Sequence, residues 1–277
     1  MSIPVPGRLA ENVRQAVVQV HGSEGSLGSG VTIAVRGAHG DVITNAHVLG
    51  GSSIRIEAWD GSALAAKVVK INRSRDLALL SVPGLKASPL PLGDSKVLRP
   101  GTPVFAIGNP LGFVGAVSSG VIHNISMRRW VCADVRLAPG NSGGPLTNFS
   151  GQVVGINTMV VNGGLALAVP SHAVEKFLKH EDARNLGVIV RSVKFKRGFG
   201  VMVTGIVAGS AAERASLLPG DILAAANGLT FAHPDDLTDA IDDAANGLLH
   251  LEFYRGDMTV TRQVTANLLA RSARTAA

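Results

Sequence analysis

A long succession of short apolar runs, each followed by turn-forming residues, most limits what this 277-residue chain can fold into. Strands at this spacing are typical of a β-sandwich or a β-barrel rather than of an α/β fold. The 33 glycines suit tight turns, and because only 4% of the residues are aromatic, Val, Ile, Leu and Ala must fill the core. The expected strands lie at residues 16–20, 30–35, 41–44, 54–58, 66–71, 77–82, 103–107, 115–122, 145–146, 153–157 and 166–169.

Glycines stand on both sides of one serine in the run Gly140-Asn141-Ser142-Gly143-Gly144-Pro145. A serine hydroxyl can attack a carbonyl usefully only beside backbone N–H groups that hold the resulting oxyanion. Glycine lets the main chain bend so that those groups and the hydroxyl face one point. The run makes Ser142 a candidate nucleophile and places a candidate oxyanion hole at Gly140, Asn141 and Ser142, with the N–H groups of Gly140 and Ser142 as donors. The alternative is a plain turn between two strands.

A base and an orienting acid occur upstream of this serine. His47 follows a short apolar strand, and Asp76 stands immediately before another. Taken singly, His47 fits a surface or packed histidine and Asp76 fits an ordinary turn residue. Their order, His47, Asp76 and then Ser142, is the one used by serine proteases built from two β-barrels. The three residues together therefore predict a catalytic triad, and they favour a pair of barrels over a sandwich.

The pattern changes towards the C-terminus. Residues 171–180 have helical periodicity behind a serine that can cap the helix, and residues 179–185 form a charged linker. Beyond the linker, strands are expected at 186–190, 200–207, 224–227, 248–255 and 258–265, with helices at 210–216 and 234–245. This alternation predicts a second, smaller α+β domain.

Composition excludes some functions. The net charge is +6, yet no basic patch interleaved with aromatic residues is present, so nucleic acid is not expected as a partner. Cys132 is the only cysteine, which excludes an intrachain disulfide, and we expect it to be a small buried hydrophobe. No metal and no cofactor is expected.

The first fifteen residues hold no continuous apolar segment, and no stretch is long enough to span a membrane. The sequence as it stands indicates a cytoplasmic protein. A periplasmic or extracellular location is expected instead if a leader segment has been trimmed.

Several segments resemble the HtrA/Deg family of serine proteases and follow its order along nearly the whole chain; they are residues 44–48, 76–80, 108–112, 119–122, 140–146, 155–158 and 165–171. The resemblance implies a chymotrypsin-like double β-barrel domain at residues 1–182, a PDZ domain at 183–268 and a flexible tail at 269–277. It also implies ATP-independent cleavage of unfolded or damaged proteins through an acyl-enzyme, often with chaperone-like holding.

The resemblance further assigns an S1 pocket to Leu137, Leu165 and Leu167. No acidic residue lies in 136–139 or 163–169, so nothing there can pair with Lys or Arg at P1. An apolar pocket discriminates by shape, and we expect Val, Ala, Leu or Ile at P1.

In the second domain the resemblance implies that a C-terminal peptide binds by strand addition, with its carboxylate held by successive backbone N–H groups. The implied peptide-binding residues are Leu186, Gly187 and Val188 for the carboxylate, Ile189 and Val190 with Val188 for the added strand, and Leu237 and Ile241 for the groove wall.

Two other functions stay open, a peptide-binding scaffold with an inert protease fold and a holdase with little proteolysis. A homo-oligomer is also open. Many relatives form trimers through aromatic residues near the N-terminus, and this N-terminal segment lacks them.

Overall fold

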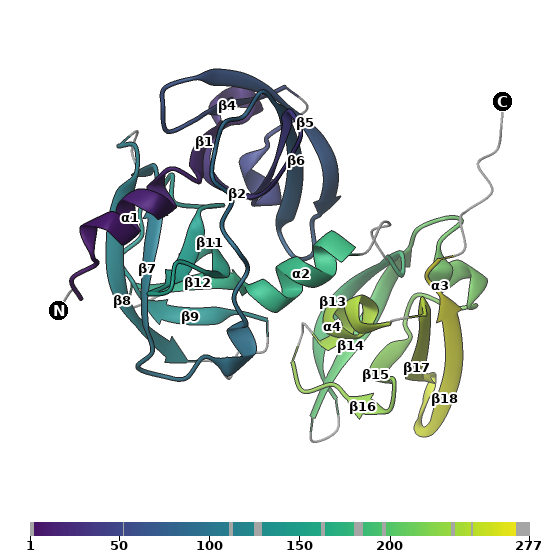
Figure 1. The fold of residues 1–277 in the computed structure, drawn as a ribbon. Coiled ribbons are helices and arrows are strands. Elements are labelled where there is room, and N and C mark those ends of the chain that lie inside the picture. Colours follow the sequence, from purple (N-terminus) through teal and green to yellow (C-terminus); the bar gives the residue numbers. More distant parts are fainter. Residues whose placement is uncertain are drawn as a thin grey trace, which may run out of the picture. The chain divides into compact units, whose positions relative to one another are not determined.

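The computed structural model describes residues 3–51, 53–110, 113–124, 129–161, 164–179, 185–195, 198–233, 236–244 and 246–269. The chain divides into two compact units, residues 1–181 and 182–277. The first unit contains two closed β-barrels, and the second contains one antiparallel sheet (Figure 1).

The first barrel closes in the order β1-β2-β3-β6-β5-β4. Along β4, Ile54 and Ile56 point inward while Arg55 is exposed, which is the alternation expected of a strand with one buried face. The core of this barrel also contains Val42 and Leu80, both fully buried. Its strands are β1 (Val17–His21), β2 (Leu27–Arg36), β3 (His39–Thr44), β4 (Ile54–Glu57), β5 (Ala63–Asn72) and β6 (Leu77–Pro83).

The second barrel closes in the order β10-β11-β12-β9-β8-β7 around Val104, Ala133 and Leu146. Cys132 is buried in it, and burial raises the pKa of its thiol. The strands are β7 (Pro103–Gly108), β8 (Ala116–Asn124), β9 (Val131–Asp134), β10 (Pro145–Asn148), β11 (Val153–Val161) and β12 (Leu165–Pro170).

An apolar cluster joins the two barrels. It brings Ile43 and Leu77 of the first barrel against Phe105 and Ile107 of the second, all fully buried. Short 3-10 helices, η1 (Ser23–Gly25), η2 (Ala46–Val48) and η3 (Ser95–Val97), lie between strands. This packing fixes the seam between the barrels, where loops from both meet.

Two helices complete the first unit. α2 (Ser171–Lys179) appears where helical periodicity predicts it and packs against strands of both barrels. α1 (Gly7–Arg14) lies against β7 and was not expected from the sequence. It is short and buries only Val13, so its apolar pattern is weak.

The second unit is an antiparallel sheet in the order β13-β14-β15-β17-β18, with β16 added to β15. Leu223, Leu249 and Leu186 are fully buried in its core. The bounds are β13 (Val188–Phe195), β14 (Gly198–Ile206), α3 (Ala211–Arg214), β15 (Ile222–Ala226), β16 (Leu229–Thr230), α4 (Asp236–Asp243), β17 (Leu248–Arg255) and β18 (Asp257–Asn267). The expectation of a mainly β chain with a double barrel is confirmed.

Candidate active site

His47 lies on the 3-10 helix η2, which follows β3 at the seam between the barrels. Its backbone N–H donates to Oδ1 of Asp76 at 2.9 Å, and its Nδ1 lies 2.7 Å from Oδ2 of the same carboxylate. Donation from Nδ1–H to Asp76 leaves Nε2 as the basic nitrogen. The hydrogen bond to Asp76 raises the pKa of His47, while burial works in the opposite direction.

Asp76 is held in an unfavourable backbone conformation directly before β6. Its φ is +54°, a region that residues other than glycine seldom occupy. The side chain of Asn45 donates to the Asp76 carbonyl at 2.8 Å and to Oγ1 of Thr158 at 3.1 Å. Asn45 is fully buried and belongs to the first barrel, whereas Thr158 belongs to the second. This amide therefore links the acid to the opposite barrel.

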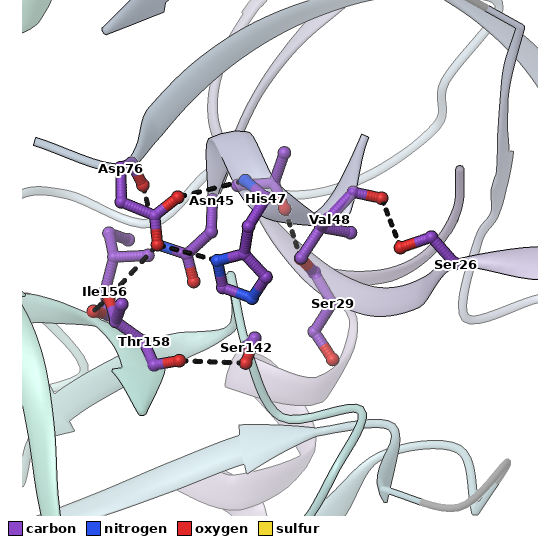
Figure 2. Close-up of polar contacts among 10 residues, drawn as sticks. Ser26, Ser29, Asn45, His47, Val48, Asp76, Ser142, Ile156 and Thr158 are labelled. Carbon is purple, nitrogen blue, oxygen red and sulfur yellow. Dashed lines mark hydrogen bonds and ion pairs between the residues drawn. The ribbon is translucent and has the colours of Figure 1, made fainter. Parts of the chain in front are cut away.

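Ser142 reaches the site from the loop before β10. Figure 2 shows the imidazole of His47 lying between the carboxylate of Asp76 and Ser142. The hydroxyl of Ser142 donates to the carbonyl oxygen of Thr158 at 3.0 Å rather than to His47 within the described residues. Catalytic hydrogen bonds often form only with substrate in place, so this bond to Thr158 does not exclude Ser142 as the nucleophile.

The loop before Ser142 contains the three residues assigned to the oxyanion hole. Gly140 has φ +102°, which only glycine adopts without strain, and an added Cβ would overlap the carbonyl oxygen of Asn109. Among the described residues, the N–H groups of Gly140 and Ser142 donate no hydrogen bond. The N–H of Asn141 donates to the carbonyl of Ala138 at 3.0 Å and is not available. Of the three residues assigned to the hole, only Gly140 and Ser142 thus have N–H groups that make no hydrogen bond within the described part of the chain.

A pocket of about 320 Å³ opens beside Ser142. Leu137 lines it, and its other wall is the end of β11 at Thr158, Met159 and Val160. None of the described residues that line the pocket is acidic.

Leu165 and Leu167, the other two residues assigned to the S1 pocket, do not line it. They lie on β12, behind β11, where Leu167 pairs with Met159 and is buried. The register of the closed barrel places β11, rather than β12, against the nucleophile loop.

Among the residues that the structure describes, no strand pairs with one edge of β11 near its end. The pairing of β10 with β11 spans Val153 to Ile156 of β11. The pairing of β12 with β11 continues further, to Val161 of β11. Met159 and Val160 are 45% and 47% exposed, so this edge and its apolar side chains face solvent next to Ser142. An extended peptide can add to such an edge through main-chain hydrogen bonds.

The second unit holds the residues assigned to peptide binding. Within the described strands β13 lies at the edge of the sheet and pairs with β14 alone, and its Ile189 and Val190 are exposed. Gly187 has φ +78°, and its N–H donates to Oδ1 of Asn185 at 2.8 Å.

The side chains of the remaining residues assigned to peptide binding belong to the core of this unit. Leu186 and Leu237 are buried, and Ile241 and Val188 pack partly buried against them. Leu186 can therefore act towards a ligand only through its main chain.

Within the described residues, no group of three or more His, Cys, Asp or Glu side chains is placed to hold a metal ion. None of the helices in that part of the chain is long and apolar enough to span a membrane.

Residues 28–156 match the trypsin-like peptidase domain. A probable periplasmic serine endoprotease, DegP-like, of Chlamydia trachomatis is 33% identical over 255 residues, covering 82% of this chain and 51% of the relative. Serine protease HTRA1 of Xenopus tropicalis is 30% identical over 276 residues, covering 86% and 59%. The chain thus spans about half to three fifths of the length of these curated relatives.

The solved structure of the HtrA-type protease AlgW with a decapeptide has the same fold, with a TM-score of 0.69 and 23% identity over 94% of this chain and 96% of that one. Two closed barrels with a His-Asp-Ser site at their seam define the class of trypsin-like serine peptidases. Within that class, this chain belongs to the HtrA/Deg family of serine proteases.

Proposed function

We propose that this chain is a serine endopeptidase that cleaves unfolded or damaged proteins. The observation that carries the proposal is the convergence at one seam of the His47–Asp76 pair, Ser142, and two backbone N–H groups without partners. These parts supply the base, the nucleophile and the oxyanion donors of acyl transfer.

The reaction follows from this geometry. Ser142 Oγ attacks the scissile carbonyl carbon while its proton passes to Nε2 of His47, and the carbonyl oxygen becomes an oxyanion facing the N–H groups of Gly140 and Ser142. Asp76 stabilises the imidazolium that forms. His47 then protonates the leaving amine, which leaves an acyl-enzyme on Ser142. Water, deprotonated by His47, hydrolyses the ester and restores the serine.

Substrate features follow from the surroundings of Ser142. The backbone N–H and C=O groups of a folded protein are mostly paired within its own structure, whereas an unfolded segment has them free to pair with the edge of β11. The pocket lined by Leu137 and Met159 is apolar, which supports a preference for Val, Ala, Leu or Ile at P1. Exposed apolar segments of unfolded chains provide both features.

The test compares the native chain with Ser142→Ala on an unfolded casein-like substrate, together with labelling by a fluorophosphonate probe and mapping of the modified residue. Ser150→Ala, an exposed serine in the β10–β11 turn, is the matched control. We expect cleavage and labelling at Ser142 in the native chain and in the control, and neither in Ser142→Ala. A native chain that is neither cleaving nor labelled would overturn the proposal. Suppression of client aggregation by the same inert chain would favour the holdase.

We also propose that the second unit acts as a PDZ domain for C-terminal peptides, whose carboxylate replaces the side chain of Asn185 as the acceptor for the N–H of Gly187. Strand β13 supports this proposal, because its free edge carries the exposed Ile189 and Val190. A full-length Ser142→Ala chain is titrated with an apolar peptide as the free acid and as the C-terminal amide. Tighter binding of the acid is expected, and equal affinity would exclude carboxylate recognition.

We propose a periplasmic or extracellular site of action, supported by the description of the chlamydial relative as a probable periplasmic endoprotease. Cell fractionation with an antibody against the chain tests this location, and recovery in the cytoplasm alone would contradict it.

A further inference from the structure

Ser29 connects the first barrel to both ends of the oxyanion-hole loop. It lies on β2 and is fully buried. Its backbone N–H donates to the carbonyl of Ser142 at 2.8 Å, and its hydroxyl donates to the carbonyl of Gly140 at 2.7 Å. Gly140 and Ser142 are the two residues whose own N–H groups are the proposed oxyanion donors. One serine from the opposite barrel therefore holds the carbonyls of both oxyanion donors.

These bonds fix two peptide groups at both of their ends. In the Gly140–Asn141 peptide, the carbonyl accepts from Ser29 and the N–H donates to Ala138. In the Ser142–Gly143 peptide, the carbonyl accepts from Ser29 and the N–H donates to Asn157 at 2.8 Å. Each fixed peptide shares an α-carbon with the peptide that carries an oxyanion donor. Turning the peptide that carries a donor N–H would therefore strain the adjoining peptide, because that peptide is planar and is held by hydrogen bonds at both ends.

The direction of the Ser29 hydroxyl is itself determined. Its oxygen accepts from the backbone N–H of Asn109 at 2.9 Å and faces the side-chain amide of Asn109 at 3.3 Å. Asn109 is 1% exposed, so no solvent competes at this point. Because these donors occupy the lone pairs of the oxygen, its proton is directed to the carbonyl of Gly140. The Asn109 carbonyl also packs against the α-carbon of Gly140.

We propose that Ser29 is a positioning residue for catalysis, which holds the Gly140 and Ser142 N–H groups in the oxyanion-forming arrangement through its hydroxyl and backbone N–H. This inference rests on the proposed peptidase function. Ser29 lies outside the triad, and in this role it stabilises the transition state indirectly, through the loop and without touching the substrate.

Ser29→Ala retains the backbone bond to Ser142 and removes the hydroxyl bond to Gly140. We expect kcat on a short apolar peptide to fall by about 10²–10³-fold, the effect of losing one oxyanion donor, while KM changes little. The inhibition constant of a peptidyl trifluoromethyl ketone should rise in parallel. Ser142 Oγ adds to its ketone carbon, the hydroxyl proton passes to His47 and the ketone oxygen becomes the oxyanion. Ser29→Cys, with a weaker donor, should fall between the native chain and Ser29→Ala in both measurements.

Ser171→Ala is the matched control for loss of a buried hydroxyl. Ser171 is 1% exposed, donates to the Gly93 carbonyl at 2.6 Å and accepts from the Ser95 N–H at 3.1 Å, so its bonding resembles that of Ser29. We expect a lower unfolding temperature but native kcat and ketone affinity.

Comparable kcat and ketone affinity in native and Ser29→Ala chains would overturn the inference. So would a Ser29→Ala defect confined to the unfolding temperature. If Ser29→Ala does not fold, native kcat and ketone affinity in Ser29→Cys would overturn it equally. By contrast, a native chain that is neither active nor labelled at Ser142 would overturn the proposed function itself.

Discussion

Asp76 holds His47 at two points, through Nδ1 of the imidazole at 2.7 Å and through the backbone N–H at 2.9 Å. The two bonds use both carboxylate oxygens, so neither the carboxylate nor the ring can turn without breaking one of them. Both residues belong to the first barrel, whereas Ser142 comes from the second. The first barrel thus orients the base, and the second barrel supplies the nucleophile. Substitutions in one barrel therefore test one of these two functions at a time.

Replacing the acid tests this orientation. In Asp76→Asn, the amide cannot hold the imidazole in the tautomer that leaves Nε2 basic, so kcat should fall by about 10⁴-fold while the fold is kept. Peptide turnover and circular dichroism measure the two effects. Asp60→Asn, in an exposed turn, is the control and should retain native turnover. Near-native turnover in Asp76→Asn would remove Asp76 from the triad and direct the search to Asp94 or Asp134.

The pH dependence follows from the same pair. His47 must be neutral to accept the serine proton, and its hydrogen bond with Asp76 raises its pKa. The acidic limb of kcat/KM should therefore lie above the ordinary pKa of histidine, and activity should be lost as the pH falls through it. In Asp76→Asn the residual activity should show this limb at lower pH. An acidic limb unmoved by the substitution would exclude the pair as its origin.

The same pKa shift also affects the stability of the fold, and its effect on stability has the opposite pH dependence to its effect on activity. Because the folded state binds the His47 proton more tightly than the unfolded state, this contribution to stability is complete below the unfolded pKa and is lost as the pH rises through the folded one. The stabilised form is therefore the inactive protonated one. Denaturant unfolding across this pH range, with His47→Gln as reference, should show the loss only in the native chain.

The pocket wall can be tested by paired substitutions. Leu137→Ala enlarges the pocket and should shift P1 preference from Val towards larger apolar residues by about tenfold in kcat/KM. Leu165→Ala is the control, because Leu165 lies on β12 away from the pocket, and should leave the preference unchanged. Peptide mapping of digests measures both. Predominant cleavage after Arg or Lys by the native chain would contradict an apolar S1 pocket.

A buried ion pair gives the second unit a separate test. Arg255 contacts both carboxylate oxygens of Asp221 at 2.7 Å, and Asp221 is fully buried. Arg255→Ala leaves that charge without its partner at a cost of about 3 kcal/mol, the lower end of the usual range because the Arg255 side chain is 35% exposed. Amide exchange in β15 and β17 should accelerate by about 100-fold. Arg262→Ala on β18 is the exposed control.

Labelling of Ser142 reports on the first unit, whereas amide exchange in β15 and β17 reports on the second. The reactivity of Ser142 towards the fluorophosphonate should stay native in Arg255→Ala, because the pair lies wholly in the second unit. Unchanged exchange in β15 and β17 would show that the ion pair contributes little.

The residues proposed to do the chemistry could be selected from the sequence because their requirements are local. Ser142 needs glycines beside it, His47 needs a strand end, and their order with Asp76 is characteristic of one architecture. The structure places all three at one seam. The mainly β class was equally accessible, because the alternation of short apolar runs and turn residues is written along the chain.

Ser29 and Asn45 could not be identified in this way. Ser29 lies 111 residues from Gly140, and Asn45 lies 113 residues from Thr158. Nothing in the neighbouring sequence of either indicates these contacts, since both are ordinary polar residues near a strand end. Likewise, the pocket beside Ser142 is lined by Thr158, Met159 and Val160 rather than by Leu165 and Leu167, which is a matter of contacts between distant segments. Sequence by itself determined which groups are candidates for the chemistry and which segments form strands, because those properties depend on neighbours along the chain. Closure and packing of the two barrels decided which strand meets the nucleophile loop, because that contact depends on register between distant segments.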